Sequence, residues 1–265
     1  MSAPVFSFSE GHIPLLISMP HNGVEIPDAI QKKMTKAGLS VADTDWYMDY
    51  LYDFAGQLGA TIIKPTYSRY VIDLNRNPNG IDLYPGANST ELCPTTNFAM
   101  EPLYKDGYTL DQAEIDYRIN TYWQPYHDKI ATTLAQMHQQ FGKAMLLDAH
   151  SIASRVPRFF QGQLPDFNFG TNDGASCDIR LLNMVTAIDY APYTSVANGR
   201  FKGGYITRAY AKPENNIHTL QLELSQRTYM DESSNTLSEE KAIKVKKKLV
   251  QMVTAIADFS QVNYV

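Results

Sequence analysis

The segment Ala-Met-Leu-Leu-Asp-Ala-His-Ser, residues 144–151, is an apolar run that ends with two polar side chains, Asp148 and His150. A second apolar run, Pro-Leu-Leu-Ile-Ser-Met at residues 14–19, leads into Pro-His-Asn-Gly and so ends at His21. Short apolar runs bounded by turn residues are typical of buried strands. The sequence therefore predicts two buried strands that each end at a histidine.

Helical and strand patterns alternate along the rest of the chain. Apolar residues three and four apart predict helices at 45–58, with Asp43 and Thr44 as candidate N-caps, and at 109–141, 178–188 and 238–259. The second of these helices is expected to break or kink near Pro125. Further strands are predicted at 60–63, 70–74, 203–210 and 218–224. This alternation predicts an α/β fold, a single domain over 1–265 with a mixed, mainly parallel sheet covered on both faces.

The expected topology brings several polar residues to one edge of that sheet. In open α/β sheets the ligand site lies at the carboxyl ends of the strands. His21, Arg76 and His150 lie near or just past apolar strands, and Glu223 lies in the last predicted strand. We therefore expect these side chains to meet in the folded protein.

Composition limits the class of protein and its partners. The 265 residues are 44% hydrophobic and 19% charged, which is typical of a globular protein. A net charge of -5 gives no basic field for a nucleic acid, and Cys93 and Cys177 are too few and too far apart for a disulfide framework. The N-terminus lacks a signal-peptide pattern, and no run of about 18 apolar residues occurs. We expect a cytoplasmic protein that binds neither nucleic acid nor membrane.

The two histidines at strand ends are candidate metal ligands. A hydrolytic zinc site needs about three nitrogen or oxygen ligands and an open position for water. His21 and His150 can supply two ligands, and Glu25, Asp45 and Asp148 are candidates for the third. Spacing does not choose among these three. The alternative is that each histidine is an ordinary loop residue with a hydrogen-bond partner.

Arginines in Asn- and Gly-rich stretches are candidates for binding an acidic ligand. Arg69, Arg76 and Arg208 all lie where a predicted strand meets a loop. A guanidinium group can bind a carboxylate through two hydrogen bonds, which suits an acidic substrate. The alternative for each arginine is a surface position or an ion pair.

Two interpretations of Glu223 remain open from the residues alone. It lies in Leu-Gln-Leu-Glu-Leu, residues 220–224, where an ionised carboxylate is costly unless it is paired or faces a cavity. A buried carboxylate with a shifted pKa is what a general base requires. The same alternation also fits a strand whose Gln221 and Glu223 both face solvent.

The stretch 77–96 is rich in Pro, Gly and Asn, so no regular structure is expected there. A loop of this length in a compact domain is often functional or closes over a ligand. The sequence leaves open whether this loop forms a lid.

Seven ordered blocks extend over almost the whole chain. They are PHNGVEIP (20–27), TDWYMDYLYDFA (44–55), YSRYVIDLNRNP (67–78), LLDAHSI (146–152), LPDFNFGTNDGASCD (164–178), NGRFKGGYITRAY (198–210) and LQLELSQRTYMDE (220–232). Together they resemble the N-formylglutamate amidohydrolase family, also called N-formylglutamate deformylases. Seven blocks in order are far more specific than any single histidine or arginine.

This resemblance implies a fold, a reaction and a cofactor. The fold implied is a three-layer α/β/α arrangement similar to zinc carboxypeptidases, of the phosphorylase/hydrolase-like type. The reaction implied is hydrolysis of N-formyl-L-glutamate to glutamate and formate, the last step of one bacterial route of histidine degradation. The cofactor implied is Zn²⁺ or another divalent transition metal such as Co²⁺ or Mn²⁺.

The resemblance also implies roles for individual residues. His21, Asp45 and His150 are similar to metal ligands of the family, and Glu223 is similar to its general base. Zinc carboxypeptidases use a His and a Glu three positions apart, whereas an apolar residue stands three positions after His21 here. Glu25, one position later, is therefore kept as the alternative to Asp45.

The arginines and Asn75 are assigned from the chemistry that such a reaction needs. Arg69 or Arg208 is expected to share the negative charge of the tetrahedral intermediate. Asn75, Arg76 and Arg208 are predicted to bind the substrate, with Arg76 on a carboxylate. The predicted ligand is a small acidic N-acyl amino acid.

Two other functions stay open at this point. One is an N-acyl-amino-acid hydrolase or carboxypeptidase-like zinc enzyme with a different acyl group or amino acid, and the size of the pocket decides between these. The other is a non-catalytic binding protein for acidic amino acids that uses the arginines without a metal. The sequence does not give the oligomeric state.

Overall fold

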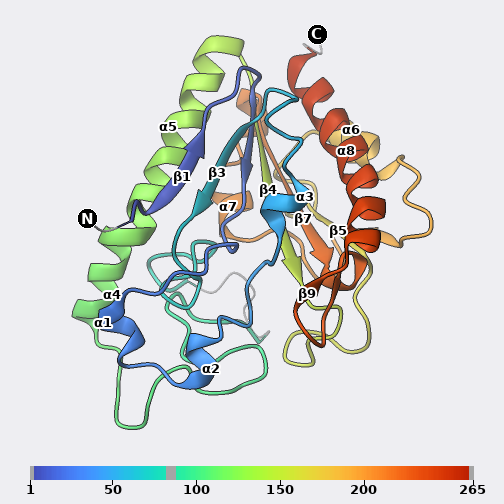
Figure 1. Cartoon of the computed structure of the whole chain (residues 1–265). Coiled ribbons are helices and arrows are strands. Elements are labelled where there is room, and N and C mark those ends of the chain that lie inside the picture. Colours follow the sequence, from blue (N-terminus) through green and yellow to red (C-terminus); the bar gives the residue numbers. More distant parts are fainter. Residues whose placement is uncertain (1–2, 82–87, 263–265) are drawn as a thin grey trace.

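The centre of the molecule is a seven-stranded sheet with the order β1-β3-β2-β4-β7-β5-β6 (Figure 1). The structure is a computed structural model, and it describes residues 3–81 and 88–262. Four of the six strand pairings are parallel, and β1–β3 and β5–β7 are antiparallel. The strands are β1 (Phe6–Ser9), β2 (Leu15–Ser18), β3 (Thr61–Pro65), β4 (Ala144–Ile152), β5 (Phe167–Gly170), β6 (Ser195–Ala197) and β7 (Ile217–Ser225). The predicted mixed, mainly parallel sheet is confirmed.

Helices cover both faces of this sheet, with α5 on one side and α8 on the other (Figure 1). A small hairpin of β8 (Met230–Asp231) and β9 (Thr236–Leu237) precedes α8. No helix in the described ranges combines the length and the apolar character needed to cross a membrane. The helices are α1 (Asp28–Gln31), α2 (Lys36–Leu39), α3 (Met48–Leu51), α4 (Gln112–Arg118), α5 (Gln124–Phe141), α6 (Ile179–Thr186), α7 (Tyr205–Ala209) and α8 (Glu239–Gln261).

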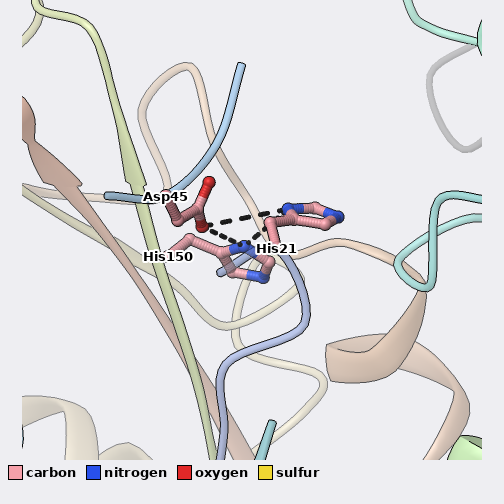
Figure 2. A group of neighbouring side chains, drawn as sticks. All are labelled: His21, Asp45 and His150. Atoms are coloured by element: carbon pink, nitrogen blue, oxygen red, sulfur yellow. Dashed lines mark hydrogen bonds and ion pairs between the residues drawn. The ribbon is translucent and has the colours of Figure 1, made fainter. Parts of the chain in front are cut away.

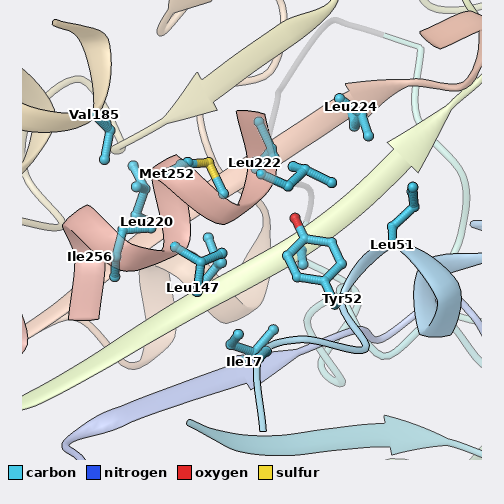
Figure 3. Packing of buried hydrophobic residues seen from close by; sticks show 14 of the residues in the cluster. Ile17, Leu51, Tyr52, Leu147, Val185, Leu220, Leu222, Leu224, Met252 and Ile256 are labelled. Atoms are coloured by element: carbon cyan, nitrogen blue, oxygen red, sulfur yellow. The ribbon is translucent and has the colours of Figure 1, made fainter. Parts of the chain in front are cut away.

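Successive side chains of the central strands point to opposite faces of the sheet, and each face carries its own hydrophobic core. In β4, Leu147 faces the core under α8, whereas its neighbour Leu146 faces the core under α5. Figure 3 shows the first core, in which Leu147 and Leu220 lie beside Met252 and Ile256 of α8. Strands buried on both faces read as continuous apolar runs, which is why β2 and β4 have no polar–apolar alternation at their starts. The predicted α/β class with helices on both faces is confirmed.

The helix predicted at 109–141 spans residues 112–141 and changes to a π-helical turn just before Pro125, where the sequence suggested a break or kink. Residues 119–123 form a short π-helical turn between α4 and α5, and Pro125 lies in the first turn of α5. Proline has no N–H to donate to the preceding helical turn, and the change of helical geometry lies directly before it. The final helix and the helix near 178 are also confirmed, the latter with Asp178 as its N-cap.

Three predicted elements differ in the structure. The helix expected at 45–58 is reduced to α3 and turns, because Tyr47 adopts a left-handed conformation (φ 60°) that interrupts it, so neither Asp43 nor Thr44 is the N-cap. No strand forms at 70–74, where the backbone makes turns. The strand expected at 203–210 is instead the short helix α7.

Parallel pairing aligns the polar ends of the central strands. β4 extends through Ile152, so Asp148 and His150 lie within the strand and not beyond it. His150 is opposite Glu223 in the β4–β7 register, and Ser18 of β2 is opposite Asp148. His21, His150 and Glu223 therefore lie together at the carboxyl ends of the parallel strands, as the sequence predicted.

Candidate active site

Three side chains with metal-ligand chemistry converge at this edge (Figure 2). His21 follows β2, Asp45 lies in the loop before α3, and His150 projects from β4. Nδ1 of His150 is 3.1 Å from Nδ1 of His21 and 3.2 Å from Oδ2 of Asp45, while Nδ1 of His21 is 3.9 Å from that oxygen. All three residues are buried. These three residues form the site we call the histidine–aspartate cluster.

Backbone contacts hold the Asp45 loop against the two strands. The Asp45 amide donates to the carbonyl of His21 at 3.0 Å. The amide of Ser151, next to His150 in β4, donates to Oδ2 of Asp45 at 3.0 Å. A residue on an irregular loop is thus fixed relative to both histidines.

Two further carboxylates lie at the Nε2 atoms of the histidine rings. Oδ1 of Asp73 lies 2.7 Å from Nε2 of His21, and Oδ1 of Asp148 lies 3.1 Å from Nε2 of His150. At His21, the Asp73 carboxylate at Nε2 favours the tautomer with its hydrogen there and leaves the lone pair on Nδ1. Nδ1 of both rings lies on the side of the Asp45 carboxylate.

This donor set fits a divalent transition metal. Tetrahedral coordination with bonds of about 2.0–2.2 Å places ligand atoms roughly 3.3 Å apart, close to the separations in the histidine–aspartate cluster. A positive charge placed between the two imidazole nitrogens and the carboxylate oxygen stabilises this close arrangement. Burial lowers the pKa of His150, but Asp148 and Asp45 outweigh burial and hold this pKa well above its usual range. The cluster therefore attracts positive charge, either a proton or a cation.

Arg69 places a fixed cation beside the histidine–aspartate cluster. Its Nη2 donates to Oδ2 of Asp73 at 2.6 Å, and its Nη1 lies 3.2 Å from Nδ1 of His21. Its side chain is buried. Burial and this guanidinium together lower the pKa of His21. Arg69 is thus positioned to donate to an oxygen atom that develops negative charge at the cluster.

Gln221 and Glu223, the two polar residues of the segment 220–224 in β7, face the site and not solvent. Gln221 is 3% exposed and Glu223 is 8% exposed, while the intervening Leu222 belongs to the core under α8. The polar–apolar alternation predicted for residues 220–224 is present. The face that carries Gln221 and Glu223 is covered by other residues and is not exposed to solvent. Burial raises the pKa of Glu223 to about 8, an effect that His150 partly offsets. The solvent-facing interpretation of Glu223 is wrong.

Asn75 connects the cluster to α7. Its Nδ2 lies 2.9 Å from Nε2 of His150 and 3.3 Å from Oδ2 of Asp148, and its Oδ1 accepts from the amide of Ile206 at 2.8 Å. A Cβ atom at Gly204 would lie 2.3 Å from Nδ2 of Asn75. Glycine is therefore needed at position 204 for this approach.

A pocket of about 80 Å³ opens onto the cluster. Its polar lining includes Arg69, Asn75, Arg76, Arg200 and Gln221 as well as Glu223 and the cluster itself. Its apolar lining consists of Phe98, Ile152, Phe159 and Phe201. Positive charge beside a small cavity suits an acidic ligand with a small apolar part.

The predicted arginines differ in how they relate to this pocket. Arg76 lines it and also borders a neighbouring cavity of about 750 Å³; its guanidinium donates to the carbonyls of Asn75 and Thr90. Arg208 is not among the residues that line the pocket, and its Nε donates to the carbonyl of Gly203 at 2.9 Å. The structure therefore brings Arg69 and Arg76 to the site but not Arg208.

Comparison with known proteins identifies the family. The family model described as N-formylglutamate amidohydrolase matches residues 13–230, which include the whole cluster and Glu223. The chain is 44% identical over 263 residues to an N-formylglutamate deformylase of Pseudomonas putida, covering 98% of each chain. It is 48% identical over 232 residues to a protein of the same name from Pseudomonas aeruginosa, covering 87% of each. The chain belongs to the N-formylglutamate amidohydrolase family.

Solved structures of similar proteins agree with this family. The crystal structure of N-formylglutamate amidohydrolase from Ralstonia eutropha superposes with a TM-score of 0.83 at 26% identity, covering 97% of this chain and 98% of that one. A gene product of Agrobacterium tumefaciens superposes with a TM-score of 0.74 at 18% identity, covering 97% and 96% of the two chains, which shows a shared fold. The predicted likeness to zinc carboxypeptidases stays a prediction.

Within this N-formylglutamate amidohydrolase fold, Glu25 does not join the cluster. Its side chain is exposed, and its backbone pairs with the segment at Tyr67, accepting from Ser68 and donating to Thr66. The alternative third ligand weighed from the sequence is therefore not supported, whereas Asp45 lies where a ligand would be needed. The loop predicted at 77–96, for which the sequence leaves a lid open, includes residues 82–87, which lie outside the described residues.

Sequence reasoning missed three residues of this family member's site. Asp73 was hidden because 70–74 resembled a strand, although an acidic residue between Arg69 and Asn75 was a signal. Arg200 lines the pocket and was passed over in favour of Arg76 and Arg208. Phe98 also lines the pocket, and no local pattern in its loop marked it.

Proposed function

We propose that this chain is a metal-dependent amidohydrolase that converts N-formyl-L-glutamate to L-glutamate and formate. The observation that carries the proposal is the convergence of His21, Asp45 and His150 beside the buried carboxylate of Glu223. Family membership supports the substrate, since the Pseudomonas relatives are named N-formylglutamate deformylases. In this role the chain would act at the end of a route of histidine degradation.

The cluster would hold the metal, for which we propose Zn²⁺, with Co²⁺ or Mn²⁺ as alternatives. Imidazole nitrogen and carboxylate oxygen suit these ions, and three protein ligands leave a position open to solvent or substrate. When bound, such an ion supplies Lewis-acid polarisation and lowers the pKa of water. Asp73 would keep the His21 ring in the tautomer that binds it through Nδ1.

Glu223 would transfer the protons of the reaction. Its carboxylate takes a proton from water as the water oxygen forms a bond to the formyl carbon. The same carboxyl group then gives that proton to the amine nitrogen as the C–N bond breaks, which yields formate and glutamate. A pKa raised by burial helps Glu223 to hold the proton between these two steps.

Arginines would stabilise the charges of substrate and intermediate. Arg69, next to Nδ1 of His21, is placed to share the oxyanion charge. Arg76 and Arg200 line the same pocket and are proposed to bind the carboxylates of the substrate. Asn75 is proposed to assist Arg76, while a role of Arg208 in catalysis or binding stays a prediction.

The small pocket favours formyl over larger acyl groups. Its volume of about 80 Å³ is well below the roughly 300–1,000 Å³ of typical ligand pockets, so little room lies beside the cluster for an acyl substituent. Formyl is the smallest acyl group, since hydrogen is its only substituent on the carbonyl carbon. A carboxypeptidase-like function, which needs room for a peptide, is less well supported.

The test is an assay of formate release from N-formyl-L-glutamate by metal-depleted and metal-supplemented protein. N-acetyl-L-glutamate, N-succinyl-L-glutamate and N-formyl-L-aspartate are the comparison substrates. We expect formate release that depends on metal, with N-formyl-L-glutamate giving the highest kcat/KM. Glutamate binding without turnover of any substrate would instead identify a non-catalytic binding protein.

A further inference from the structure

Phe98 separates the candidate active site from a second cavity. The second cavity has a volume of about 270 Å³ and is lined by Val156, Pro157, Gln226 and other residues. Phe98, Ser151 and Ile152 line this cavity and the active-site pocket alike. These three residues therefore form the partition between the two spaces.

This partition lies directly against the histidine–aspartate cluster. The guanidinium of Arg69 lies over the ring of Phe98, 5.0 Å from its centroid, and the same guanidinium is 3.2 Å from Nδ1 of His21. The amide of Ser151 donates to Oδ2 of Asp45. A carbonyl carbon attacked at the cluster would therefore lie close to the partition.

The position of Phe98 is fixed by its surroundings. Its amide donates to Oδ2 of Asp43 at 2.9 Å, so the loop that carries Asp45 also carries the partner of Phe98. The carbonyl of Asn97 accepts from Nη1 of Arg158 at 2.7 Å. The ring of Phe98 packs edge-on against Phe159, with centroids 4.8 Å apart.

We propose that Phe98 determines acyl-group selectivity by closing the pocket to any substituent larger than the hydrogen of a formyl group. The inference rests on the proposed function, since it concerns the acyl group that is hydrolysed. Of the two apolar residues in the partition, Ile152 ends a central strand and is 5% exposed, whereas Phe98 is carried by a loop. Removing the ring of Phe98 joins the active site to the second cavity and makes room for an acetyl group.

The test compares kcat/KM for N-acetyl-L-glutamate with kcat/KM for N-formyl-L-glutamate in wild type and variants. One methylene in an apolar pocket changes selectivity by about 10- to 200-fold, so Phe98→Ala should raise the acetyl-to-formyl ratio by about tenfold or more. Phe98→Leu should raise the ratio by less. Any displacement of Arg69 lowers both kcat/KM values together and leaves their ratio unchanged.

Phe160→Ala is the matched control. Phe160 belongs to the same aromatic cluster, where it contacts Phe201 at 6.0 Å between centroids, but it lines neither cavity. The acetyl-to-formyl ratio of kcat/KM in Phe160→Ala should stay within about twofold of wild type. If Phe98→Ala fails to fold, Phe98→Leu decides, with a rise of about threefold or more as the expected result.

Failure of the Phe98 inference can be distinguished from failure of the proposed function. If wild type releases formate and the folded Phe98 variants keep the wild-type ratio, Phe98 does not set the selectivity and this inference is overturned. If wild type releases no formate from N-formyl-L-glutamate in the presence of metal, the proposed function itself is wrong, and the inference is overturned with it.

Discussion

At the scale of single residues, Glu223 shows where sequence reasoning ends. The alternation in residues 220–224 predicts a strand with Gln221 and Glu223 on one face, and that much is confirmed. Whether that face meets solvent or a site depends on what covers it, and the covering residues come from distant segments. The burial that raises its pKa to about 8 is a property of the fold and not of the local sequence.

Glu223→Gln tests the proton-transfer role. The amide keeps the shape and most hydrogen bonds but cannot accept the proton of water, so kcat should fall by about 10²-fold or more. Metal content, measured by elemental analysis, should stay near that of wild type. Glu240→Gln, an exposed carboxylate paired with Lys244 on α8, should leave kcat unchanged. Normal kcat in Glu223→Gln would make the side chain structural, and loss of metal would make it a ligand.

Asp73→Asn tests the carboxylate that contacts both His21 and Arg69. The amide can still accept from Nε2 of His21, but it cannot neutralise the guanidinium 2.6 Å from the present carboxylate. Loss of such an orienting carboxylate typically weakens metal affinity by about 10- to 100-fold. Competition with a metal-binding dye measures that affinity. The exposed Asp53→Asn, which loses its pair with Lys246, should retain wild-type affinity, and equal affinities in both variants would remove Asp73 from this role.

Arg76→Ala tests recognition of the substrate carboxylate. Arg76 is half-buried, so its loss should cost about 2 kcal/mol, the lower end of the range for buried charge pairs, and kcat/KM for N-formyl-L-glutamate should fall by about 30-fold. Arg180→Ala, which removes an arginine paired with Asp178 at the surface, serves as the control. An unchanged kcat/KM in folded Arg76→Ala would transfer carboxylate binding to another arginine, with Arg200→Ala the next variant to measure.

At the scale of elements, the errors have a common physical cause. The central strands β4 and β7 were predictable because their apolar runs encode burial locally. Residues 70–74 are equally apolar, yet the Asp73 amide donates to the carbonyl of Leu92 and the carbonyl of Val71 accepts from Arg118. Backbone groups that find distant partners need no neighbouring strand, and no local pattern records those partners.

The contacts of α5 predict a pH dependence of stability. The His127 ring is buried, with Nε2 2.8 Å from the carbonyl of Leu74 and Nδ1 2.8 Å from the hydroxyl of Tyr210. Trp123 stacks on the ring at 3.6 Å between centroids. A neutral imidazole satisfies both contacts, and burial lowers the pKa of His127 to about 3.

The sign of this effect follows from proton binding. Between pH 6.5 and about 3 the unfolded chain binds a proton at His127 that the folded protein excludes, so the free energy of unfolding falls as pH is lowered through this window. The contribution is at most about 1.4 kcal/mol per pH unit. In urea unfolding from pH 7 to pH 4.5, His127→Gln should show a shallower loss than wild type. His138→Gln should keep the wild-type slope, and equal slopes in all three proteins would contradict the assignment.

At the scale of the whole molecule, the candidate site joins segments that lie far apart in the chain. His21, His150 and Glu223 could be expected at one edge because the carboxyl ends of parallel strands meet there. Asp45 could be preferred over Glu25 and Asp148 only by resemblance, since its place depends on a loop held by contacts to His21 and Ser151. Topology is thus readable from strand patterns, whereas the geometry of loop residues is not.

Metal binding should therefore stabilise the fold as a whole. Ligands contributed by positions 21, 45 and 150 are brought together only in the folded chain, so an ion held by all three binds the native state preferentially. Free metal at about 1,000 times its dissociation constant should raise the free energy of unfolding by about 4 kcal/mol, and a chelator should remove that increment. Urea unfolding with and without Zn²⁺ measures it. His21→Ala should lose most of the increment, while His138→Ala, with its histidine on α5 away from the cluster, should retain it. Wild-type stability that does not respond to Zn²⁺, Co²⁺ or Mn²⁺ would mean that the three side chains hold a proton between them and not a metal.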